Sequence, residues 1–400
     1  MNTPAQRALV SVTGPDHLGI TAALTEVIAA HRAELLDIEQ VVVQRQLTLC
    51  VLVSLPSGAL EGDPLIGALR AVTAEMGLDL QVRALGAPET EEARAPRYAV
   101  TAIGDGLGAS GVNALSTALA SHGANIEWIR RLSTHGLTSL EIICALPGRE
   151  HAVALRRSLI EAVEGRDIDV AVQRETLTRR SKRLVVMDMD STLIQVEVVD
   201  ELARLHGVAD AVADITRRAM EGELDYEASL RERVRMLAGL RFADVRELAR
   251  NLPLQTGARD LVRVLHTLGF RTAVISGGFE VAAQAVKDEL GLHYAYANRL
   301  EVKDGVLTGE VLDPVVTPSR KADLLDAIAQ QESIALEQTI AIGDGANDLL
   351  MLERAGLGIA FHAKPALKQA ADTSLSAGGL DRVLYLLGLH ARDVNELLNG

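Results

Sequence analysis

Aromatic residues are scarce in this sequence. One tryptophan, five tyrosines and four phenylalanines make up only 2% of its 400 residues. Hydrophobic residues still account for 48% of the chain, so packed cores must be built from leucine, valine, isoleucine and alanine. A chain of this length and composition is expected to fold into two or three domains.

Positive charge is also in short supply. Forty Lys and Arg residues face 54 Asp and Glu residues, which gives a formal net charge of -14. This excess argues against general nucleic-acid binding, which needs a basic face, and against adsorption to anionic membranes. We interpret the basic run in residues 174–183 as a solvated connector rather than a nucleic-acid patch. No nucleic acid and no membrane is expected as a partner.

Only two cysteines are present, and each lies in an apolar, strand-like stretch. Cys50 and Cys144 are therefore predicted to be reduced core residues rather than a disulfide bridge. The amino terminus shows no secretory signal, so a cytoplasmic protein is expected. The longest uncharged apolar run, residues 47–60, contains Pro56 and Gly58 and is too short to span a bilayer.

The first 173 residues contain the same pattern twice. Each copy predicts the order βαββαβ, in residues 1–85 and 98–173, and the charged, proline-bearing residues 86–97 form a linker. The segment Ala30-His31-Arg32-Ala33-Glu34-Leu35 matches Ser121-His122-Gly123-Ala124-Asn125-Ile126. A repeat of about ninety residues indicates a duplicated module.

Residues 184–400 predict a different architecture. Strands are expected at 184–187, 271–275, 338–342 and 356–361, with helices between them and a hairpin turn at Lys303-Asp304-Gly305. Four amphipathic helices are expected at 198–205, 209–220, 226–237 and 242–252, as a cap over about 198–255 inserted between the first two core strands. Strands alternating with helices predict an α/β fold with a doubly wound parallel sheet.

Acidic residues follow two of these strands. Asp188 and Asp190 come after the strand at 184–187, while Asp344 and Asp348 flank the end of the strand at 338–342. An isolated Asp-x-Asp is better explained as a turn that ends a strand. In a parallel sheet, however, all carboxyl ends lie on one edge, so four carboxylates should converge there. Magnesium favours such hard oxygen ligands, and the pattern therefore predicts a Mg²⁺ site.

Several motifs together resemble the phosphoserine phosphatase family of the haloacid dehalogenase superfamily, and the two amino-terminal units resemble ACT domains. The motifs are Asp188-Met-Asp-Ser-Thr192 with Glu197, Met220-Glu-Gly, Ser229-Leu-Arg-Glu-Arg233-Val, Ser276-Gly-Gly-Phe, Ala297-Asn-Arg-Leu, Lys321 and Gly343-Asp-Gly-Ala-Asn-Asp348. The resemblance covers residues 184–395 closely.

The resemblance implies a role for each catalytic residue. Asp188 would be the nucleophile that forms a phosphoaspartyl intermediate, and Asp190 the general acid and base. Asp188, the main-chain carbonyl of Asp190 and Asp344 would hold the metal, supported by Asp348. The phosphoryl oxygens would be bound by Ser276, Gly277, Gly278 and Lys321.

Substrate choice would lie mainly with the cap. Glu197 and Arg233 would bind the ammonium and carboxylate of O-phospho-L-serine, Met220 and Tyr226 would close over its aliphatic part, and Asn347 would also contact substrate. For each cap residue the alternative is an ordinary surface ion or core side chain. The alternative for Lys321 is an exposed lysine in the first turn of a helix that begins at Thr317-Pro318-Ser319.

The ACT resemblance implies amino-acid regulation. The turn Gly14-x-Asp16-x-x-Gly19 precedes the first helix, where backbone amides could hold a carboxylate. L-serine or another amino acid is the expected regulatory ligand. In the second unit the turn ends at Gly108 and its aspartate is displaced. The alternative is that both glycine turns only reverse the chain. A homodimer or higher homo-oligomer is expected.

The resemblance thus implies a Mg²⁺-dependent phosphoserine phosphatase at the last step of serine biosynthesis. Two alternatives stay open: a related phosphatase for another small phosphate ester, and an inactive amino-acid-sensing regulatory protein.

Overall fold

The computed structural model describes residues 6–55, 60, 62–86, 95–136 and 138–399. The chain divides into two units, Met1–Arg94 and Ala95–Gly400. Most of the predicted linker at 86–97 lies outside the described residues. Each unit is considered by itself below.

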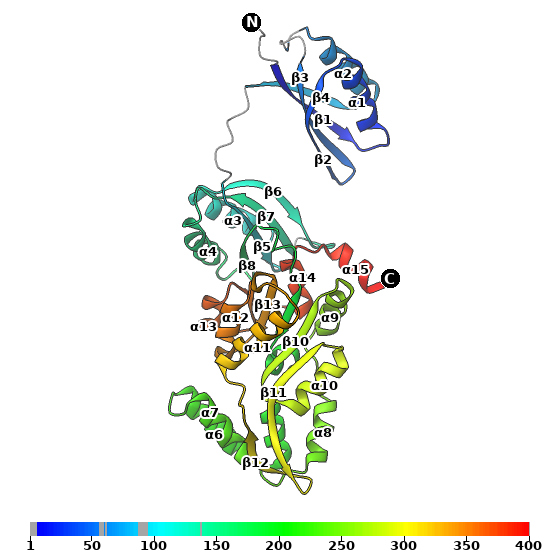
Figure 1. Ribbon diagram of the computed structural model, residues 1–400. Helices are drawn as coiled ribbons and strands as arrows, with labels where there is room; N and C mark the ends of the chain where they lie inside the picture. Colours follow the sequence, from blue (N-terminus) through cyan, green and yellow to red (C-terminus); the bar gives the residue numbers. More distant parts are fainter. Residues whose placement is uncertain (1–5, 56–59, 61, 87–94, 137, 400) are drawn as a thin grey trace. The chain divides into compact units, whose positions relative to one another are not determined.

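The first unit is a four-stranded antiparallel sheet with two helices on one face (Figure 1). Its strand order is β2-β3-β1-β4, and the alternating residues of β1 and β3 point into a core closed by α1 and α2. The elements are β1 (Gln6–Pro15), α1 (Ile20–Ala30), β2 (Glu34–Val43), β3 (Gln46–Leu55), α2 (Pro64–Glu75) and β4 (Asp79–Leu85).

The second unit begins with the same module. Its sheet has the order β6-β7-β5-β8, which matches the first sheet position by position and confirms the duplication predicted from the repeat. The elements are β5 (Arg97–Ile103), α3 (Ala109–Ser121), β6 (Asn125–Arg131), β7 (Ser139–Ala145), α4 (His151–Ala162) and β8 (Asp169–Arg174).

The two modules differ in one important respect. Strand β7 is buried at six of its seven positions, whereas β3 of the first module is buried at every second position. The helices α3 and α4 cover one face of the second sheet, and the other face packs against the core that follows, since Ile103 and Ala171 belong to its hydrophobic cluster. The second module is therefore an integral part of the larger unit.

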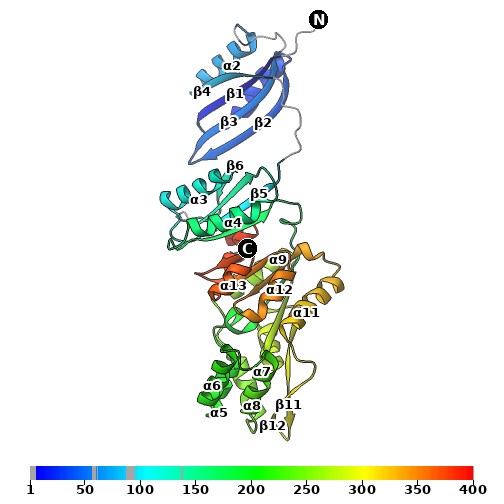
Figure 2. The same cartoon turned by 90° about the vertical axis from the view of Figure 1, so that its left-hand side faces the viewer.

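A seven-stranded sheet forms that larger core (Figure 2). Its order is β12-β11-β10-β9-β13-β14-β15, and all neighbouring strands are parallel except the β11/β12 hairpin. The strands are β9 (Leu184–Met187), β10 (Arg271–Phe279), β11 (Tyr294–Lys303), β12 (Val306–Leu312), β13 (Thr339–Gly343), β14 (Gly358–Phe361) and β15 (Thr373–Leu375). This arrangement confirms the predicted doubly wound α/β fold.

One set of helices packs on both faces of this sheet, and a second set forms the cap. The cap helices fall where the sequence predicts them: α5 (Val198–His206), α6 (Ala209–Met220), α7 (Tyr226–Arg235) and α8 (Phe242–Arg250). The core helices are α9 (Ala258–Thr267), α10 (Glu280–Leu290), α11 (Pro318–Gln331), α12 (Leu349–Arg354), α13 (Pro365–Ala370), α14 (Val383–Leu386) and α15 (Ala391–Asn399). None of the helices in the described ranges is long and apolar enough to cross a membrane.

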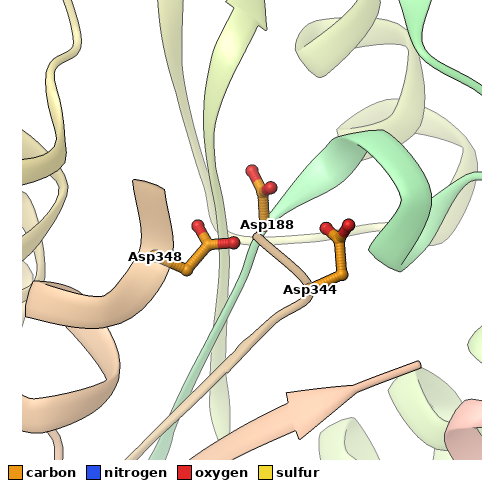
Figure 3. Close-up of side chains that lie close together, drawn as sticks. All are labelled: Asp188, Asp344 and Asp348. Atoms are coloured by element: carbon orange, nitrogen blue, oxygen red, sulfur yellow. The ribbon is translucent and has the colours of Figure 1, made fainter. Parts of the chain in front are cut away.

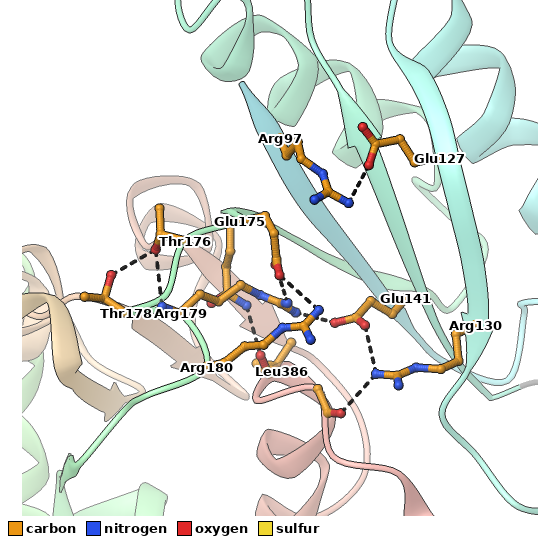
Figure 4. A network of polar contacts seen from close by, with 12 residues as sticks. Arg97, Glu127, Arg130, Glu141, Glu175, Thr176, Thr178, Arg179, Arg180 and Leu386 are labelled. Atoms are coloured by element: carbon orange, nitrogen blue, oxygen red, sulfur yellow. Dashed lines mark hydrogen bonds and ion pairs between the residues drawn. The ribbon is translucent and has the colours of Figure 1, made fainter. Parts of the chain in front are cut away.

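The basic run in residues 174–183 is only partly solvated: Arg174, Arg180 and Arg183 are exposed, as expected of a solvated connector, but Arg179 and Lys182 are not. Arg179 pairs with the buried Glu141 of β7 (Figure 4). Arg179 is only 4% exposed and Lys182 only 6%. The Nζ atom of Lys182 donates to the carbonyl of Glu337 at 2.6 Å. Arg179 therefore anchors the connector on the second module and Lys182 anchors it on the core, because buried charges need partners.

The two cysteines are free, as predicted. Cys144 is completely buried, and burial raises the pKa of its thiol to about 11. Cys50 differs from the prediction of a core residue, since it is partly exposed; its Sγ lies 3.7 Å from Ser11 Oγ.

Candidate active site

Three carboxylates meet at the carboxyl edge of the central strands (Figure 3). Asp188, Asp344 and Asp348 each offer an oxygen, and these oxygens all lie within 4.8 Å of one another. Strands β9 and β13 run parallel with Met187 opposite Ile342, so the residues that follow each strand lie at the same edge. The sequence prediction of convergent acidic residues is realised for these three side chains.

Lys321 is buried between two of these carboxylates. Its Nζ donates to Asp188 Oδ1 and to Asp348 Oδ1, at 2.7 Å each, and its side chain is not exposed at all. Helix α11 begins as expected, with Thr317 accepting a hydrogen bond from the amide of Arg320 and Pro318 in the first turn. The alternative of an exposed first-turn lysine is therefore excluded.

The charges of this cluster do not balance. Burial raises the pKa of Asp188 well above its usual value and the neighbouring Asp348 raises it further, while Lys321 acts in the opposite direction. Burial and Asp348 likewise raise the pKa of Asp344 to about 7. Burial alone would lower the pKa of Lys321, but Asp188 and Asp348 outweigh it and raise that pKa. One cation faces three carboxylates, and this donor set fits a further, divalent cation.

The side chain of Asp190 lies apart from this cluster. Its Oδ1 accepts a hydrogen bond from the amide of Val198 at 2.8 Å, and its Oδ2 accepts one from the hydroxyl of Ser276 at 3.1 Å. Burial and the nearby charge of Glu197 raise the pKa of Asp190 to about 7. A carboxyl group tuned to this range can both give and take a proton near neutral pH. Any contact of Asp190 with a metal would come from its main chain, as the resemblance implies.

The chain between Asp188 and Glu197 makes a tight turn that aims these groups. Ser191 has a φ of 59°, a conformation that residues other than glycine seldom adopt, and its hydroxyl donates to Glu197 Oε1 at 2.8 Å. Thr192 donates to Asp344 Oδ1 at 3.2 Å. The sequence prediction gave Ser191 and Thr192 no role of their own, because their partners become neighbours only in the folded chain.

The irregular carboxyl end of β10 at Ser276-Gly277-Gly278, called the loop below, has no room for a side chain larger than glycine at two positions. A Cβ on Gly277 would lie 1.8 Å from the hydroxyl of Tyr226, and one on Gly278 would lie 2.5 Å from Asp190 Oδ2. Within the loop, the amide of Gly278 donates to Ser276 Oγ at 2.8 Å. The loop can therefore approach both the cap and the acid at Asp190.

A cavity of about 370 Å³ opens over this edge between core and cap. Its lining includes the predicted substrate residues Glu197, Met220, Tyr226, Arg233, Gly277, Gly278 and Asn347, together with Asp188, Asp190 and Asp344. Met220 is 70% exposed at the rim, whereas Lys321 and Ser276 are completely buried behind the wall. The cap residues taken from the resemblance thus share one cavity with Asp188 and Asp344 of the acidic cluster, whereas Asp348 is completely buried.

Comparison with known proteins matches this arrangement. Residues 185–353 match the family model of the haloacid dehalogenase-like hydrolases, and residues 6–83 and 97–173 each match a model of the ACT domain. The chain is 43% identical over 383 residues to the phosphoserine phosphatase SerB2 of Mycobacterium tuberculosis, covering 95% of this chain and 93% of that protein. This chain belongs to the phosphoserine phosphatase family.

A further relative and two solved structures are also similar to this chain. The phosphoserine phosphatase of Streptomyces coelicolor is 42% identical over 389 residues, covering 96% of this chain and 93% of that protein. Among solved structures, a probable phosphoserine phosphatase from Vibrio cholerae in unliganded form is 34% identical with a TM-score of 0.55, covering 75% of this chain and 88% of the other. A HAD family hydrolase from Salmonella enterica serovar Typhi gives a TM-score of 0.62 at 30% identity, covering 72% and 98%.

The two ACT domains of this phosphoserine phosphatase family member differ at their glycine turns. In the first, Gly19 (φ 92°) precedes α1 and Asp16 is exposed, while a Cβ on Gly14 would lie 2.6 Å from the side chain of Leu78. In the second, Gly104 has a φ of 152°, and a Cβ there would lie 2.0 Å from the carbonyl oxygen of Asp167. Gly108 precedes α3 and has open space around it. Close packing thus explains Gly14 and Gly104.

Proposed function

We propose that this protein hydrolyses O-phospho-L-serine to L-serine and phosphate, the last step of serine biosynthesis. The observation that carries the proposal is the cavity lined by Asp188 and Asp344 together with Glu197 and Arg233, with Asp348 buried within 4.8 Å of the first two carboxylates. A phosphate ester of an amino acid has three charged ends. Glu197 and Arg233 are the proposed partners of the ammonium and the carboxylate, and a metal held by the carboxylates would face the phosphate. The similarity to named phosphoserine phosphatases along nearly the whole chain supports the same substrate.

The first step is attack of Asp188 on phosphorus. A carboxylate oxygen of Asp188 forms a bond to phosphorus while the bond from phosphorus to the serine oxygen breaks, giving a phosphoaspartyl group. The proton on Asp190 passes to the departing serine oxygen. Lys321 neutralises part of the charge and fixes Asp188 through its Oδ1, leaving Oδ2 to attack.

The second step uses the same residues in reverse. Asp190, now ionised, accepts a proton from water, whose oxygen attacks phosphorus and displaces the carboxylate of Asp188. A pKa of about 7 suits this double role, because the group is then partly in each form near neutral pH. The amides of Gly277 and Gly278 and the hydroxyl of Ser276 are the proposed partners of the phosphoryl oxygens.

The cofactor in this proposal is Mg²⁺. Asp188, the main-chain carbonyl of Asp190 and Asp344 would hold the ion and Asp348 would support it. When bound, the ion neutralises charge on the phosphoryl oxygens. The excess of carboxylates over cations in the cluster supports this assignment.

Recognition of the serine part falls to the cap. Arg233 can bind the carboxylate through two parallel hydrogen bonds, and Glu197 can pair with the ammonium group. Tyr226 is mostly buried, which raises the pKa of its hydroxyl to about 12, so it remains neutral while packing over the substrate with Met220.

Amino-acid regulation and self-association complete the proposal. The turn of Gly14, Asp16 and Gly19 is the proposed site for L-serine, Gly108 marks its counterpart in the second ACT domain, and the enzyme is proposed to act as a homodimer or higher homo-oligomer. Two free cysteines support a reducing, cytoplasmic location.

The test is phosphate release from a panel of esters with Mg²⁺, with and without added L-serine. We expect O-phospho-L-serine to have the highest kcat/KM of the panel, at least tenfold above O-phosphoethanolamine, which lacks the carboxylate. A higher kcat/KM for another ester would reassign the substrate, and no release from any ester would indicate an inactive regulatory protein. If added L-serine leaves the rates unchanged and does not bind to the full chain, the proposed regulation by L-serine is wrong.

A further inference from the structure

The geometry points to Asn298 as a positioning residue that holds the phosphoryl-binding loop and the start of the Lys321 helix in register. Asn298 lies on β11 and is completely buried. Its Nδ2 donates a hydrogen bond to the carbonyl of Gly277 at 2.8 Å, and its Oδ1 accepts one from the amide of Val316 at 2.7 Å. One side chain therefore connects two segments that carry groups of the active site.

The bond to Gly277 fixes the orientation of a peptide in the loop. The carbonyl of Gly277 and the amide of Gly278 belong to one planar peptide unit and point in opposite directions. Holding the carbonyl therefore also aims the Gly278 amide, which donates to Ser276 Oγ, and Ser276 in turn donates to Asp190. The amide of Asn298 thus acts through the loop on the general acid.

The bond to Val316 fixes the segment that leads to the lysine. Val316 immediately precedes Thr317, which caps α11, and the amide of Lys321 donates to the carbonyl of Thr317 at 3.0 Å. Lys321 reaches Asp188 and Asp348 from the first turn of this helix. A shift at Val316 would therefore be passed to the ammonium group that holds the nucleophile.

Only a side-chain amide of this length satisfies both partners. A carbonyl can only accept and an amide N–H can only donate, so the two partners also fix which end of Asn298 is which. An aspartate would keep the bond to Val316 but place a carboxylate oxygen against the carbonyl of Gly277. A leucine would leave both backbone groups buried without their partner.

The inference rests on the proposed function, and the full-length enzyme tests it. We compare wild type with Asn298→Asp and measure kcat/KM for O-phospho-L-serine and p-nitrophenyl phosphate, and inhibition by orthovanadate, an analogue of the transferred phosphoryl group. Misplacement of catalytic groups by about 1 Å can reduce rates by about 100-fold. We expect kcat/KM to fall about 100-fold for both substrates, mainly in kcat, and inhibition by vanadate to weaken at least tenfold.

The matched control is Thr272→Val. Thr272 is also completely buried and hydrogen-bonded, to His266 at 2.8 Å, but it lies at the opposite end of the sheet from the active site. We expect this variant to lower the thermal midpoint and to keep kcat/KM and vanadate inhibition within twofold of wild type. The inference is overturned if Asn298→Asp behaves in the same way, since its role would then be structural only.

A second variant covers the case in which Asn298→Asp does not fold. Asn298→Ser removes the reach of the side chain without adding charge, and the same two substrates and vanadate are then measured below its thermal midpoint, with the same expected and contrary results. Failure of the proposed function is distinguishable, because wild type would then not hydrolyse phosphoserine. In that case, a lower kcat/KM for p-nitrophenyl phosphate and weaker vanadate inhibition in the Asn298 variants would still test the role of Asn298.

Discussion

The buried pair of Glu141 and Arg179 gives the sharpest stability prediction. Glu141 is 0% exposed on β7, and its carboxylate pairs with Arg179 from the segment after β8 and with Arg130 at 3.2 Å (Figure 4). Arg179 also contacts Glu175 at 2.7 Å. We consider Arg179→Met, which removes the buried cation and leaves the carboxylate of Glu141 with only the half-exposed Arg130.

The expected effect is large because the remaining charge has no access to water. Removing one partner of a buried ion pair destabilises proteins by about 3–5 kcal/mol, whereas an exposed pair contributes about 0–1 kcal/mol. Arg180 offers a matched control, since it pairs with Glu175 at 2.9 Å but is 54% exposed. We expect Arg180→Met to change the free energy of unfolding by less than about 1 kcal/mol. Replacing both members of the buried pair, as Glu141→Leu with Arg179→Met, should recover much of the loss.

Urea unfolding followed by tryptophan fluorescence is a suitable assay. The chain has a single tryptophan, Trp128, which lies on β6 of the second ACT domain with the guanidinium of Arg130 5.2 Å from its ring. Its signal therefore reports unfolding of the domain that the ion pair anchors. With a urea dependence of about 1–3 kcal/mol per molar, the midpoint for Arg179→Met should fall by roughly 1 M or more. Equal, small shifts for Arg179→Met and Arg180→Met would refute the reasoning.

Three further predictions concern the cap, the proposed general acid Asp190 and the connector. Arg233→Ala should lower kcat/KM for phosphoserine at least tenfold more than for p-nitrophenyl phosphate, because only the amino acid has a carboxylate to bind; equal losses would count against the cap assignment. Asp190→Asn should lower turnover of phosphoserine by about 10²–10⁴, yet release about one equivalent of nitrophenol rapidly from the aryl ester, whose leaving group needs no proton; undiminished steady turnover would contradict the role of Asp190. Burial lowers the pKa of Lys182 to about 8, although the charges of Asp372 and Glu337 act in the opposite direction. Between pH 8 and about 10.5 the unfolded state therefore binds more protons than the folded state, so stability rises with pH. Relative to Lys182→Met, the free energy of unfolding of wild type should therefore rise by up to about 3 kcal/mol between pH 7 and 11, as measured by calorimetry. Parallel pH dependences of the two proteins would exclude the lowered pKa of Lys182 as the cause.

The main elements could be predicted because their signals are local. Asp63, Asp225 and Thr317 cap α2, α7 and α11 through their side chains, and Gly207 and Gly291 end α5 and α10 in the left-handed conformation. Apolar runs then separate the buried strands from the amphipathic helices. The acidic cluster could be predicted for the same reason, since parallel strands bring their ends to one edge.

The carboxyl-terminal part was harder to predict. Strand β15 has only three residues and α14 only four, which is too short for a hydrophobic period to show.

The buried state of Arg179 and Lys182 also had no local signal, because their partners Glu141 and Glu337 are far away in the sequence. One clue was available: Leu140 to Ala145 is apolar at nearly every position, as expected of a strand covered on both faces.

The central claim is that Asp188 attacks phosphorus in a cluster completed by Lys321, Asp344 and Asp348. The most direct measurement is phosphate release from O-phospho-L-serine with Mg²⁺ by wild type and by Asp188→Asn, which keeps the size of the side chain but removes the nucleophilic carboxylate. We predict turnover by wild type and a loss of at least 10⁴-fold in the variant. Turnover by Asp188→Asn within tenfold of wild type would contradict the account.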